Sequence, residues 1–517
     1  MSASLPLLAT SATTGPIERV ENAIDGAFTP VSDAVSAVIF APVTFGEISF
    51  PWIVSWLIIG AVVFTIGYKF IQIRGFAHAT ALARGKYDDP TAPGEVTHFQ
   101  ALTAAVSGTV GLGNIAGVAV AVSIGGPGAT FWMIVAGLLG MATKFVECTL
   151  GVAFREEHPD GTVTGGPFRY LAVAFRKLKV PGLAKVLVAV YAVAILAFGL
   201  AGGNMFQANQ TFAQAENVTG GADGPLGSGG ASLIFGLVLA TLVGAVIIGG
   251  IQSIAKVTSR LVPAMAIVYV LACLTVLAFN ATAVPGAFAA IVDGAFDPEG
   301  VAGGIIGVMV VGFQRAAFSN EAGLGSAAIA HSAVKTRHPV TEGYVALLEP
   351  FIDTVIICTM TAVTIVVASP QSWLDARDAY AAGESPSPDG VVLTSDAFAT
   401  VIPWFPVVLA IAVALFAFST LITWSYYTLK AWTTLFGRTP GSELTFKLLY
   451  CVFTVIGTVL TFSAVLSFAD AMLFICALVN ILGLYLLFPE VRQMLRDYTA
   501  ARRAGEIVPI AEREPTA

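Results

Sequence analysis

Charged residues are scarce in this chain of 517 residues. They make up 11% of it, whereas hydrophobic residues make up 56% and the mean hydropathy is +0.82. A soluble domain carries roughly 25% charged residues, so this chain cannot cover soluble globules of its length with a polar surface. The net charge of −7 also argues against binding to a phosphate backbone. Soluble enzymes and nucleic-acid partners are excluded, and a lipid bilayer is expected around the protein.

Cysteine pairs, clustered histidines and catalytic motifs are also missing. The five cysteines lie in apolar stretches without C-x-x-C spacing, and the five histidines show no metal-ligand spacing. Residues 111–116 match a G-x-G-x-x-A pattern by letters, but no strand precedes them. We therefore expect no disulfide framework, no resident transition metal and no enzymatic activity.

Long apolar runs dominate the chain. A membrane helix needs about 20 such residues, and the alternating pattern of a membrane barrel is absent. Eleven ranges qualify: 51–73, 97–123, 127–153, 183–212, 231–254, 258–281, 302–333, 343–368, 402–430, 446–466 and 468–488. The sequence predicts an all-α polytopic membrane protein with eleven transmembrane helices.

Lysine and arginine predict the orientation. If the eleven spans alternate, 22 of the 26 basic residues lie in or beside segments on one side, and only Arg19 and Arg377 lie on the other. By the positive-inside rule, the C-terminus is cytoplasmic and the N-terminus is external. Residues 1–50 lack the pattern of a signal peptide, so no cleavage is expected. Apolar residues at helical spacing over 17–28 predict an interfacial helix on the outer surface.

Two runs of glycine and polar residues lie at membrane depth, at 107–114 and 312–326. Glycine costs about 1 kcal/mol relative to alanine inside a helix, so such runs favour unwinding where they line a cavity. Freed carbonyls can bind a cation, and the N-terminal end of a half-helix can face a carboxylate. The alternative is that these glycines only let helices pack closely. Residues 202–210 and 418–427 add amides and hydroxyls, which can also serve as helix contacts.

Several charges lie inside the predicted spans, where they usually pair with one another. Lys144 and Glu147 are three residues apart, so we expect them to pair on one helix face. Arg315 could pair with an acid, as a lock or as a gate; the acids considered are Glu321, Glu349 and Asp353.

Five motifs in order resemble the alanine/glycine:cation symporter family, the sodium:alanine symporters. The motifs are 108–119 (GTVGLGNIAGVA), 125–133 (GGPGATFWM), 140–147 (GMATKFVE), 318–326 (FSNEAGLGS) and 416–427 (FAFSTLITWSYY). The resemblance covers about residues 50–490. It implies the fold of neurotransmitter:sodium symporters, with two inverted five-helix repeats at 97–282 and 302–490. An additional helix at 51–75 would precede them, and a cytoplasmic tail at 491–517 would follow.

The resemblance also implies a binding site at the first glycine run. The substrate-binding residues would be Gly111, Leu112, Gly113, Asn114, Gln207, Phe313, Ala317 and Trp424. Sodium, the co-transported ion, would contact Gly111, Asn114, Ser419 and Thr420.

The chain departs from the family pattern at three positions. Leu112 stands where threonine is common, Ile134 where a second tryptophan is common, and Ala316 where glycine is common. Leu112 removes a hydroxyl from the implied pocket and adds apolar bulk, which puts the substrate in doubt.

The expected function is a monomeric, sodium-coupled symporter that imports a small neutral amino acid, alanine or glycine, across the bacterial inner membrane by alternating access. The alternatives are proton coupling or a larger amino acid, with Glu321, Glu349 and Asp353 as proton sites. A channel is a further alternative from another class, as is an intramembrane enzyme.

Overall fold

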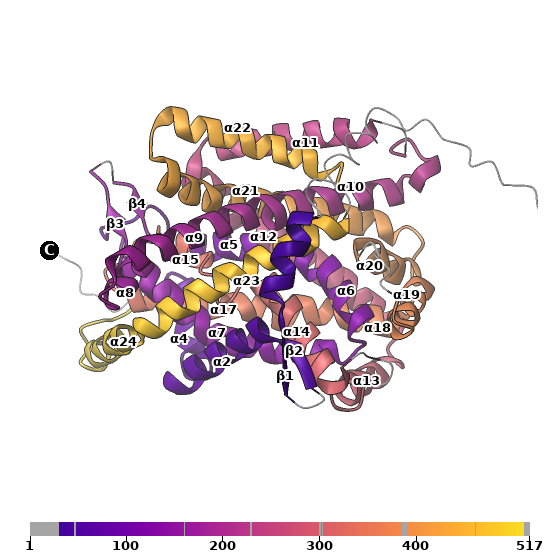
Figure 1. The fold of residues 1–517 in the computed structure, drawn as a ribbon, viewed down its shortest axis with the longest axis horizontal. Helices are drawn as coiled ribbons and strands as arrows, with labels where there is room; N and C mark the ends of the chain where they lie inside the picture. The colour runs from indigo at the N-terminus through magenta and orange to yellow at the C-terminus, as the bar shows by residue number, and fades with distance from the viewer. Residues whose placement is uncertain are drawn as a thin grey trace, which may run out of the picture.

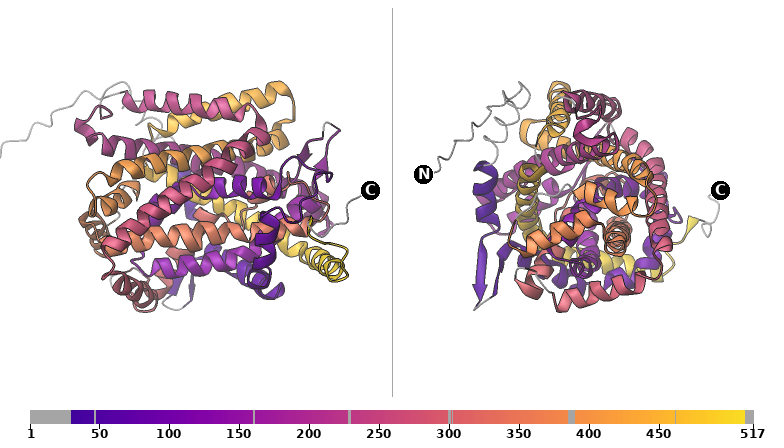
Figure 2. Two further views of the ribbon diagram at one scale, coloured as in Figure 1. Left: turned by 180° about the vertical axis from the view of Figure 1, so that it is seen from behind. Right: turned by 90° about the vertical axis from the view of Figure 1, so that its right-hand side faces the viewer.

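The computed structural model describes residues 30–510, apart from 46–47, 160, 228–229, 299–300, 302, 385–389 and 461. Within this part of the chain the structure is helical, apart from two short antiparallel hairpins. The long helices run roughly along the long axis of the molecule (Figure 1), and many are seen end-on in the right-hand view of Figure 2. The predicted interfacial helix at 17–28 lies outside the described residues.

The N-terminal elements lead into the first predicted span. They are a helix at Pro30–Ile39, β1 (Pro42–Phe45), β2 (Ile48–Pro51), α2 (Trp52–Gly67), α3 (Ile71–Arg74) and α4 (Phe76–Ala83). Helix α2 lies against α7 and α23, so the additional helix packs on one helix of each half of the chain.

The second predicted span is broken, as the glycine run indicates. It consists of α5 (His98–Thr109), the 3₁₀ turn η1 (Leu112–Asn114) and α6 (Ala116–Ile124), with a bend of 57° between its halves. Thr97 caps α5 by accepting a hydrogen bond from the Gln100 N–H, which fixes the start of the span.

The remaining elements of the first half of the chain run from α7 to α13, and several of them are long helices. They comprise α7 (Ala129–Ala153), β3 (Glu156–Glu157), β4 (Val163–Thr164), α8 (Pro167–Arg176), α9 (Pro181–Leu200), the π-helical η2 (Ala201–Met205), α10 (Phe206–Val218), η3 (Gly221–Asp223), α11 (Ala231–Ile247), α12 (Gly250–Phe279) and α13 (Val284–Phe296). The amide run at 202–210 thus lies where a continuous helix widens to π geometry, a form that often marks functional positions.

The seventh predicted span is also interrupted. Helix α14 (Gly304–Asn320) ends at the polar run, and the short α15 (Ala327–His331) follows it. The next elements are α16 (Pro339–Ala346), α17 (Leu348–Pro350), the π-helical η4 (Phe351–Cys358), α18 (Thr359–Ala368), α19 (Gln371–Ala381) and α20 (Gly390–Ala399).

The last helices include one that reaches the first break. They are α21 (Phe405–Phe436), α22 (Pro440–Gly457), α23 (Phe462–Leu486) and α24 (Phe488–Arg503). Helix α21 is unbroken and packs against α5, α9 and α12. Helices α11 and α22 lie side by side at the top of Figure 1.

Six helices in the described residues are long and apolar enough to cross a membrane, or seven with the bent α5–α6 pair. Each of the eleven predicted ranges contains a helix, but α2 and α11 have only 16 and 17 residues. The multi-span helical architecture is confirmed, whereas the number eleven and the inverted repeats remain predictions.

The charges inside the spans pair differently from the expectation. The Nζ atom of Lys144 lies 3.2 Å from a carboxylate oxygen of Glu349, and Glu147 instead accepts a hydrogen bond from the Asn480 amide. Arg315 pairs with Asp470 rather than with Glu321, Glu349 or Asp353. Sequence spacing reports only neighbours on the same helix, whereas these partners lie on other helices.

Candidate functional site

The first break is the bend between α5 and α6, around η1. Its free backbone N–H groups donate hydrogen bonds to side-chain oxygens. The N–H of Gly111 donates to Oδ1 of Asn114 at 2.9 Å, and the N–H of Leu112 donates to Oε1 of Gln207 at 3.1 Å. Gln207 is held in turn by its own amide, which donates to the Gly202 carbonyl at 3.0 Å. Unwound backbone survives at membrane depth only with such partners. The structure thus joins Gln207 to the first break.

Helix α21 brings hydroxyl groups to the same place. The hydroxyl of Thr420 donates to the Ser107 carbonyl at 3.0 Å, and a Cβ atom on Gly111 would lie 2.5 Å from Thr420 Oγ1. The hydroxyl of Ser419 donates to the Phe416 carbonyl at 2.8 Å and also contacts the sulfur of Met265. Thr420 therefore faces the break directly, whereas the Ser419 hydroxyl turns toward α12.

Trp424 connects the two broken spans. Its indole N–H lies 3.2 Å from the Gly108 carbonyl in the first span and 3.2 Å from Oε1 of Glu321 at the second break. The ring packs on η2, where a Cβ atom on Gly203 would lie 2.3 Å from Trp424 Cγ. Glycine at 203 is therefore required for this close approach, and part of the amide run is a packing surface.

The second break lies between α14 and α15, and its backbone is left-handed at several residues. Glu321 has a φ of 56°, and Gly323 and Gly325 have φ values of 96° and 85°. Such a φ is uncommon for a residue other than glycine and often occurs at functional sites. Neighbouring side chains satisfy the freed carbonyls: the Asn480 amide donates to Gly323, and the Tyr191 hydroxyl donates to Leu324.

A second polar cluster surrounds Asp353, which is fully buried in the π-helical η4. Its carboxylate accepts hydrogen bonds from the Asn114 amide at 2.6 Å, the Ser319 hydroxyl at 2.8 Å and the Thr354 hydroxyl at 2.7 Å. Both broken spans thus place a donor on one carboxylate, the Asn114 amide nitrogen from the first and the Ser319 hydroxyl from the second. The carboxylate and the two hydroxyl oxygens are ligands that suit a hard cation such as sodium. Ser319 and Thr354 are absent from the predicted site, although Asp353 in an apolar span is a signal for it.

Phe313 and Ala317, the two predicted pocket residues on α14, are buried. With Leu57, Ala136 and Ile481, among others, they line a cavity of about 10 Å³. Phe318, rather than either of them, approaches Gly113. The structure brings together Gly111, Leu112, Asn114, Gln207, Thr420 and Trp424. Among the described residues, no hydrogen bond joins Phe313 or Ala317 to the first break.

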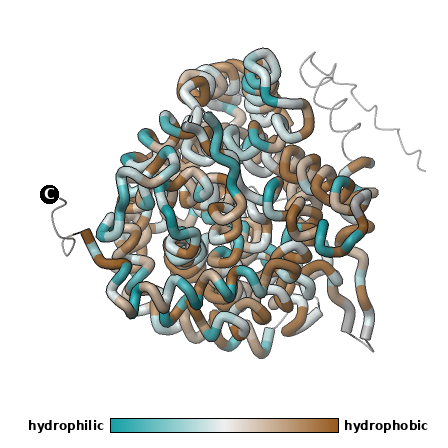
Figure 3. Tube along the Cα trace, turned by 90° about the vertical axis from the view of Figure 1, so that its left-hand side faces the viewer, coloured by the Kyte–Doolittle hydropathy of each residue, from teal (hydrophilic) through white to brown (hydrophobic). Residues whose placement is uncertain are grey.

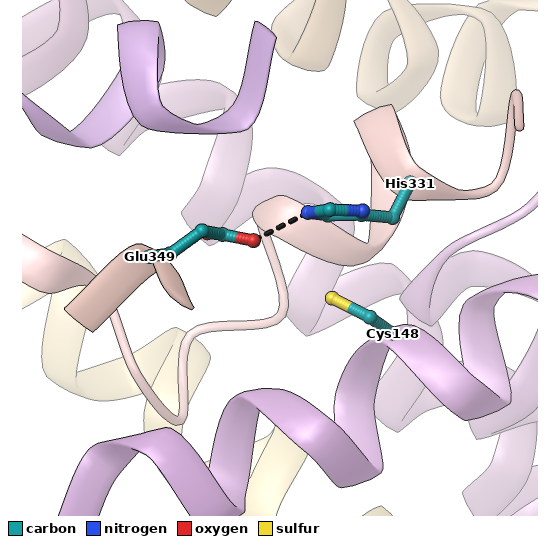
Figure 4. Close-up of side chains that lie close together, drawn as sticks. All are labelled: Cys148, His331 and Glu349. Carbon is teal, nitrogen blue, oxygen red and sulfur yellow. Dashed lines mark hydrogen bonds and ion pairs between the residues drawn. The ribbon is translucent and has the colours of Figure 1, made fainter. Parts of the chain in front are cut away.

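Cys148, His331 and Glu349 lie close together inside the protein (Figure 4), with possible ligand atoms within 4.8 Å of one another. Such a set can bind a transition metal. However, Nε2 of His331 already contacts Glu349, and the ammonium of Lys144 lies at the other oxygen of the same carboxylate. A cation there would meet an existing positive charge, so these residues fit an ion-pair network better than a metal site.

This network requires an additional proton. His331 has a carboxylate at each ring nitrogen: Glu342 lies 2.6 Å from Nδ1, and Glu349 lies at Nε2. An ionised carboxylate only accepts hydrogen bonds, and a neutral imidazole donates only one. Either the His331 ring carries two protons or one carboxyl group is protonated. Histidine spacing in the sequence gives no sign of this arrangement, because its members come from different helices.

Comparison with known proteins identifies the family. The model of the sodium:alanine symporter family matches residues 35–512. The chain is 38% identical to a sodium/alanine symporter of Methanococcus maripaludis, over 86% of this chain and 94% of that protein. It is 31% identical to a probable sodium/glutamine symporter of Bacillus subtilis, over 86% and 87% of the two chains.

A solved structure shares the fold. The crystal structure of MhsT in complex with L-phenylalanine has a TM-score of 0.52 and 17% sequence identity, and the match covers 75% of this chain and 88% of that one. The family match extends over most of the chain and includes both broken spans. The protein is therefore a membrane transporter that belongs to the sodium:alanine symporter family.

Proposed function

We propose that the protein imports alanine or glycine together with sodium across the bacterial inner membrane by alternating access. The main support is Trp424, whose single N–H group contacts both broken spans. A ligand that enters between the two breaks changes the contacts of both, and this is the linkage that a transport cycle requires. The predicted orientation places the C-terminus in the cytoplasm.

Sodium is proposed to bind beside the first break. Thr420 Oγ1 uses its proton toward the Ser107 carbonyl, so its lone pairs remain for a cation. Gly111, Asn114 and Ser419 complete the proposed ligand set, with Ser419 contributing after its hydroxyl turns from α12. The oxygen cluster of Ser319, Asp353 and Thr354 is a candidate for a second cation.

The amino acid is proposed to lie between the two breaks. Its charged ends would contact the backbone of Gly111, Leu112 and Gly113 and the side chains of Asn114 and Gln207. Trp424 would close one side, and Phe313 and Ala317 would take part after a movement of α14. Sodium and substrate then share one unwound segment, and each stabilises the conformation that the other prefers.

Leu112 leaves room for a different substrate. Its side chain is fully buried, and its N–H group donates to Gln207. The size of this side chain should therefore limit the space in the proposed pocket. A relative whose name specifies glutamine is 31% identical over 86% of this chain, against 38% for the relative named for alanine. Replacing Leu112 with Thr should change the preference among alanine, glycine and larger amino acids in uptake assays. An unchanged ranking would remove Leu112 from the pocket.

Thermal unfolding of the purified protein tests the ligand assignment. A ligand that binds only the folded state raises the midpoint by mass action. Alanine or glycine should stabilise the protein more in sodium chloride than in potassium chloride, and glutamine less than either. Equal stabilisation in both salts would contradict shared binding. Stabilisation by glutamine alone would retain the transporter but change its substrate.

Proton coupling is the alternative that the buried carboxylates favour. Glu321, Glu349 and Asp353 are each at most 3% exposed. In a pH-jump uptake assay, Glu349→Gln should leave sodium-driven transport coupled if sodium is the driving ion. Loss of a proton-driven component in this variant would support the alternative.

A further inference from the structure

One end of the molecule carries α8, α24 and the β3–β4 hairpin; it lies at the left of Figure 1 and faces the viewer in Figure 3. A basic hollow lies beside α24 at this end. It has a volume of about 500 Å³ and is bounded by α3, α4 and α24 together with the end of α2. Six cationic side chains line it: Lys69, Arg74, Arg492, Arg496, Arg502 and Arg503. The sequence places this end at the cytoplasmic face of the membrane.

Within the described residues, no carboxylate forms an ion pair with the basic side chains of the hollow, and no acidic residue lines it. Other cations at the same end are paired, such as Arg169 with Glu156 and Lys177 with Glu490. Six like charges around one hollow create a strong local potential that attracts an anion.

The segment that contributes Lys69 and Arg74 to the hollow also carries exposed apolar residues. Ile66, Phe70 and Ile73 are 62%, 51% and 73% exposed, and they alternate along the chain with Lys69 and Arg74. Lys69 and Phe70 both have left-handed backbone, with φ values of 56° and 55°. Two consecutive strained residues hold this tight turn between an apolar surface and a cationic one.

The hollow is a built feature of the fold. The Tyr68 hydroxyl donates to the Phe488 carbonyl at 3.0 Å, and His78 Nε2 is hydrogen-bonded to the Tyr498 hydroxyl at 2.7 Å. These contacts fix α24 against α2 and α4. Burial, and then the charge of Arg502, lower the pKa of His78 to about 4, so the wall of the hollow disfavours a further cation.

We propose that this hollow binds the headgroup of an anionic phospholipid, with the lipid chains lying along Ile66, Phe70 and Ile73. Basic pockets beside membrane helices on the cytoplasmic side suit such headgroups. A soluble phosphate would use the cations but not the exposed apolar residues. This site is separate from the two helix breaks, so the proposal does not depend on the transported substrate.

Lipid-dependent thermal stability of the full-length protein tests this site. In detergent, phosphatidylglycerol should raise the unfolding midpoint, whereas phosphatidylcholine and inorganic phosphate at equal concentration should not. The triple variant Arg492→Gln, Arg496→Gln, Arg502→Gln should need about 100-fold more phosphatidylglycerol for the same shift, because each basic group near an anionic surface contributes about fivefold. A control triple variant, Arg169→Gln, Arg176→Gln, Arg438→Gln, should keep the wild-type response.

A photoactivatable phosphatidylglycerol provides a second test on the unaltered protein. Mass spectrometry of the cross-linked protein should find the label within residues 66–74 or 488–503. Labelling elsewhere would overturn the proposal, as would equal stabilisation of both triple variants or an equal effect of phosphatidylcholine. Full stabilisation by inorganic phosphate would make the hollow a site for free anions instead.

Discussion

Thr420 shows how one hydroxyl can serve two partners at the first break. It donates its proton to Ser107 and lies against Gly111, so its lone pairs remain for a cation. Replacing Thr420 with Ala should raise the sodium concentration for half-maximal uptake about fivefold, since one lost contact of this kind is worth roughly 1 kcal/mol. Initial uptake rates over a sodium titration measure the effect.

The Thr420→Ser variant is the matched control. It keeps the hydroxyl and should retain an affinity close to that of the wild type. If alanine and serine at 420 give the same sodium dependence, the hydroxyl is not a ligand.

Trp424 is the residue whose N–H group joins both breaks. Replacing it with Phe leaves a buried Glu321 oxygen without this donor, which should lower the unfolding free energy by about 1–3 kcal/mol and reduce uptake. Trp432 provides a control because its N–H group contacts only the Ser442 hydroxyl, outside the site. Trp432→Phe should leave uptake near the wild-type rate. If it reduced uptake as much as Trp424→Phe does, the two contacts of the Trp424 N–H group would not explain the effect.

Glu342 controls the proton that the His331 network requires. In Glu342→Gln the new amide can donate to Nδ1 of His331, so a neutral ring suffices and the net charge of the network is kept. In the wild type, rising pH removes the proton and leaves a single donor at the His331 ring for two carboxylates, while His98 Nδ1 and the Lys144 ammonium keep their contacts with Glu342 and Glu349. The thermal midpoint of the wild type should therefore fall more steeply between pH 7 and pH 10 than that of Glu342→Gln.

Asp396→Asn is the control for this pH effect. Asp396 is half-buried and lies outside the network, and it accepts a hydrogen bond from the Ser372 hydroxyl at 2.6 Å, a contact that asparagine can preserve. This variant should keep the wild-type slope. Equal slopes in wild type and Glu342→Gln would show that the network holds no titrating proton in this range.

At the level of elements, the glycine runs predict the two helix breaks. Glycine lowers helix stability wherever it occurs, so its effect can be read from the local sequence. The run at 107–114 indicates the 57° bend, and the run at 312–326 indicates the interruption after α14. The partners of Lys144 and Arg315 could not be predicted, since Glu349 and Asp470 come from other helices. The role of Asp353 depends equally on how three segments meet.

Two glycines of the same broken span, Gly111 and Gly117, have very different surroundings and can be compared by substitution. A Cβ atom on Gly111 would lie 2.5 Å from Thr420 Oγ1 and 3.1 Å from Gln207 Oε1, whereas one on Gly117 would meet nothing within 4 Å. Gly111→Ala should therefore reduce sodium-dependent uptake strongly. Gly117→Ala should be tolerated and can add up to about 1 kcal/mol of helix stability. Equal uptake by the two variants would argue against a site at the first break.

At the scale of the whole molecule, composition alone establishes a membrane protein, and the order of motifs indicates the family. The number of spans is harder to obtain, because helices such as α2 and α11 are shorter than the apolar runs that predict them. Long-range placement also produces the basic hollow, where residues near 70 meet residues near 500. No local pattern relates these two segments.

Uptake of labelled alanine into proteoliposomes tests sodium coupling most directly. A membrane potential of 100 mV adds about 2.3 kcal/mol per sodium ion to the concentration term, so an inward sodium gradient should drive accumulation above equilibrium. Equal sodium on both sides without a potential should allow exchange only. Accumulation driven by a proton gradient in the absence of sodium, or uptake that ignores the sodium gradient, would contradict the proposed mechanism.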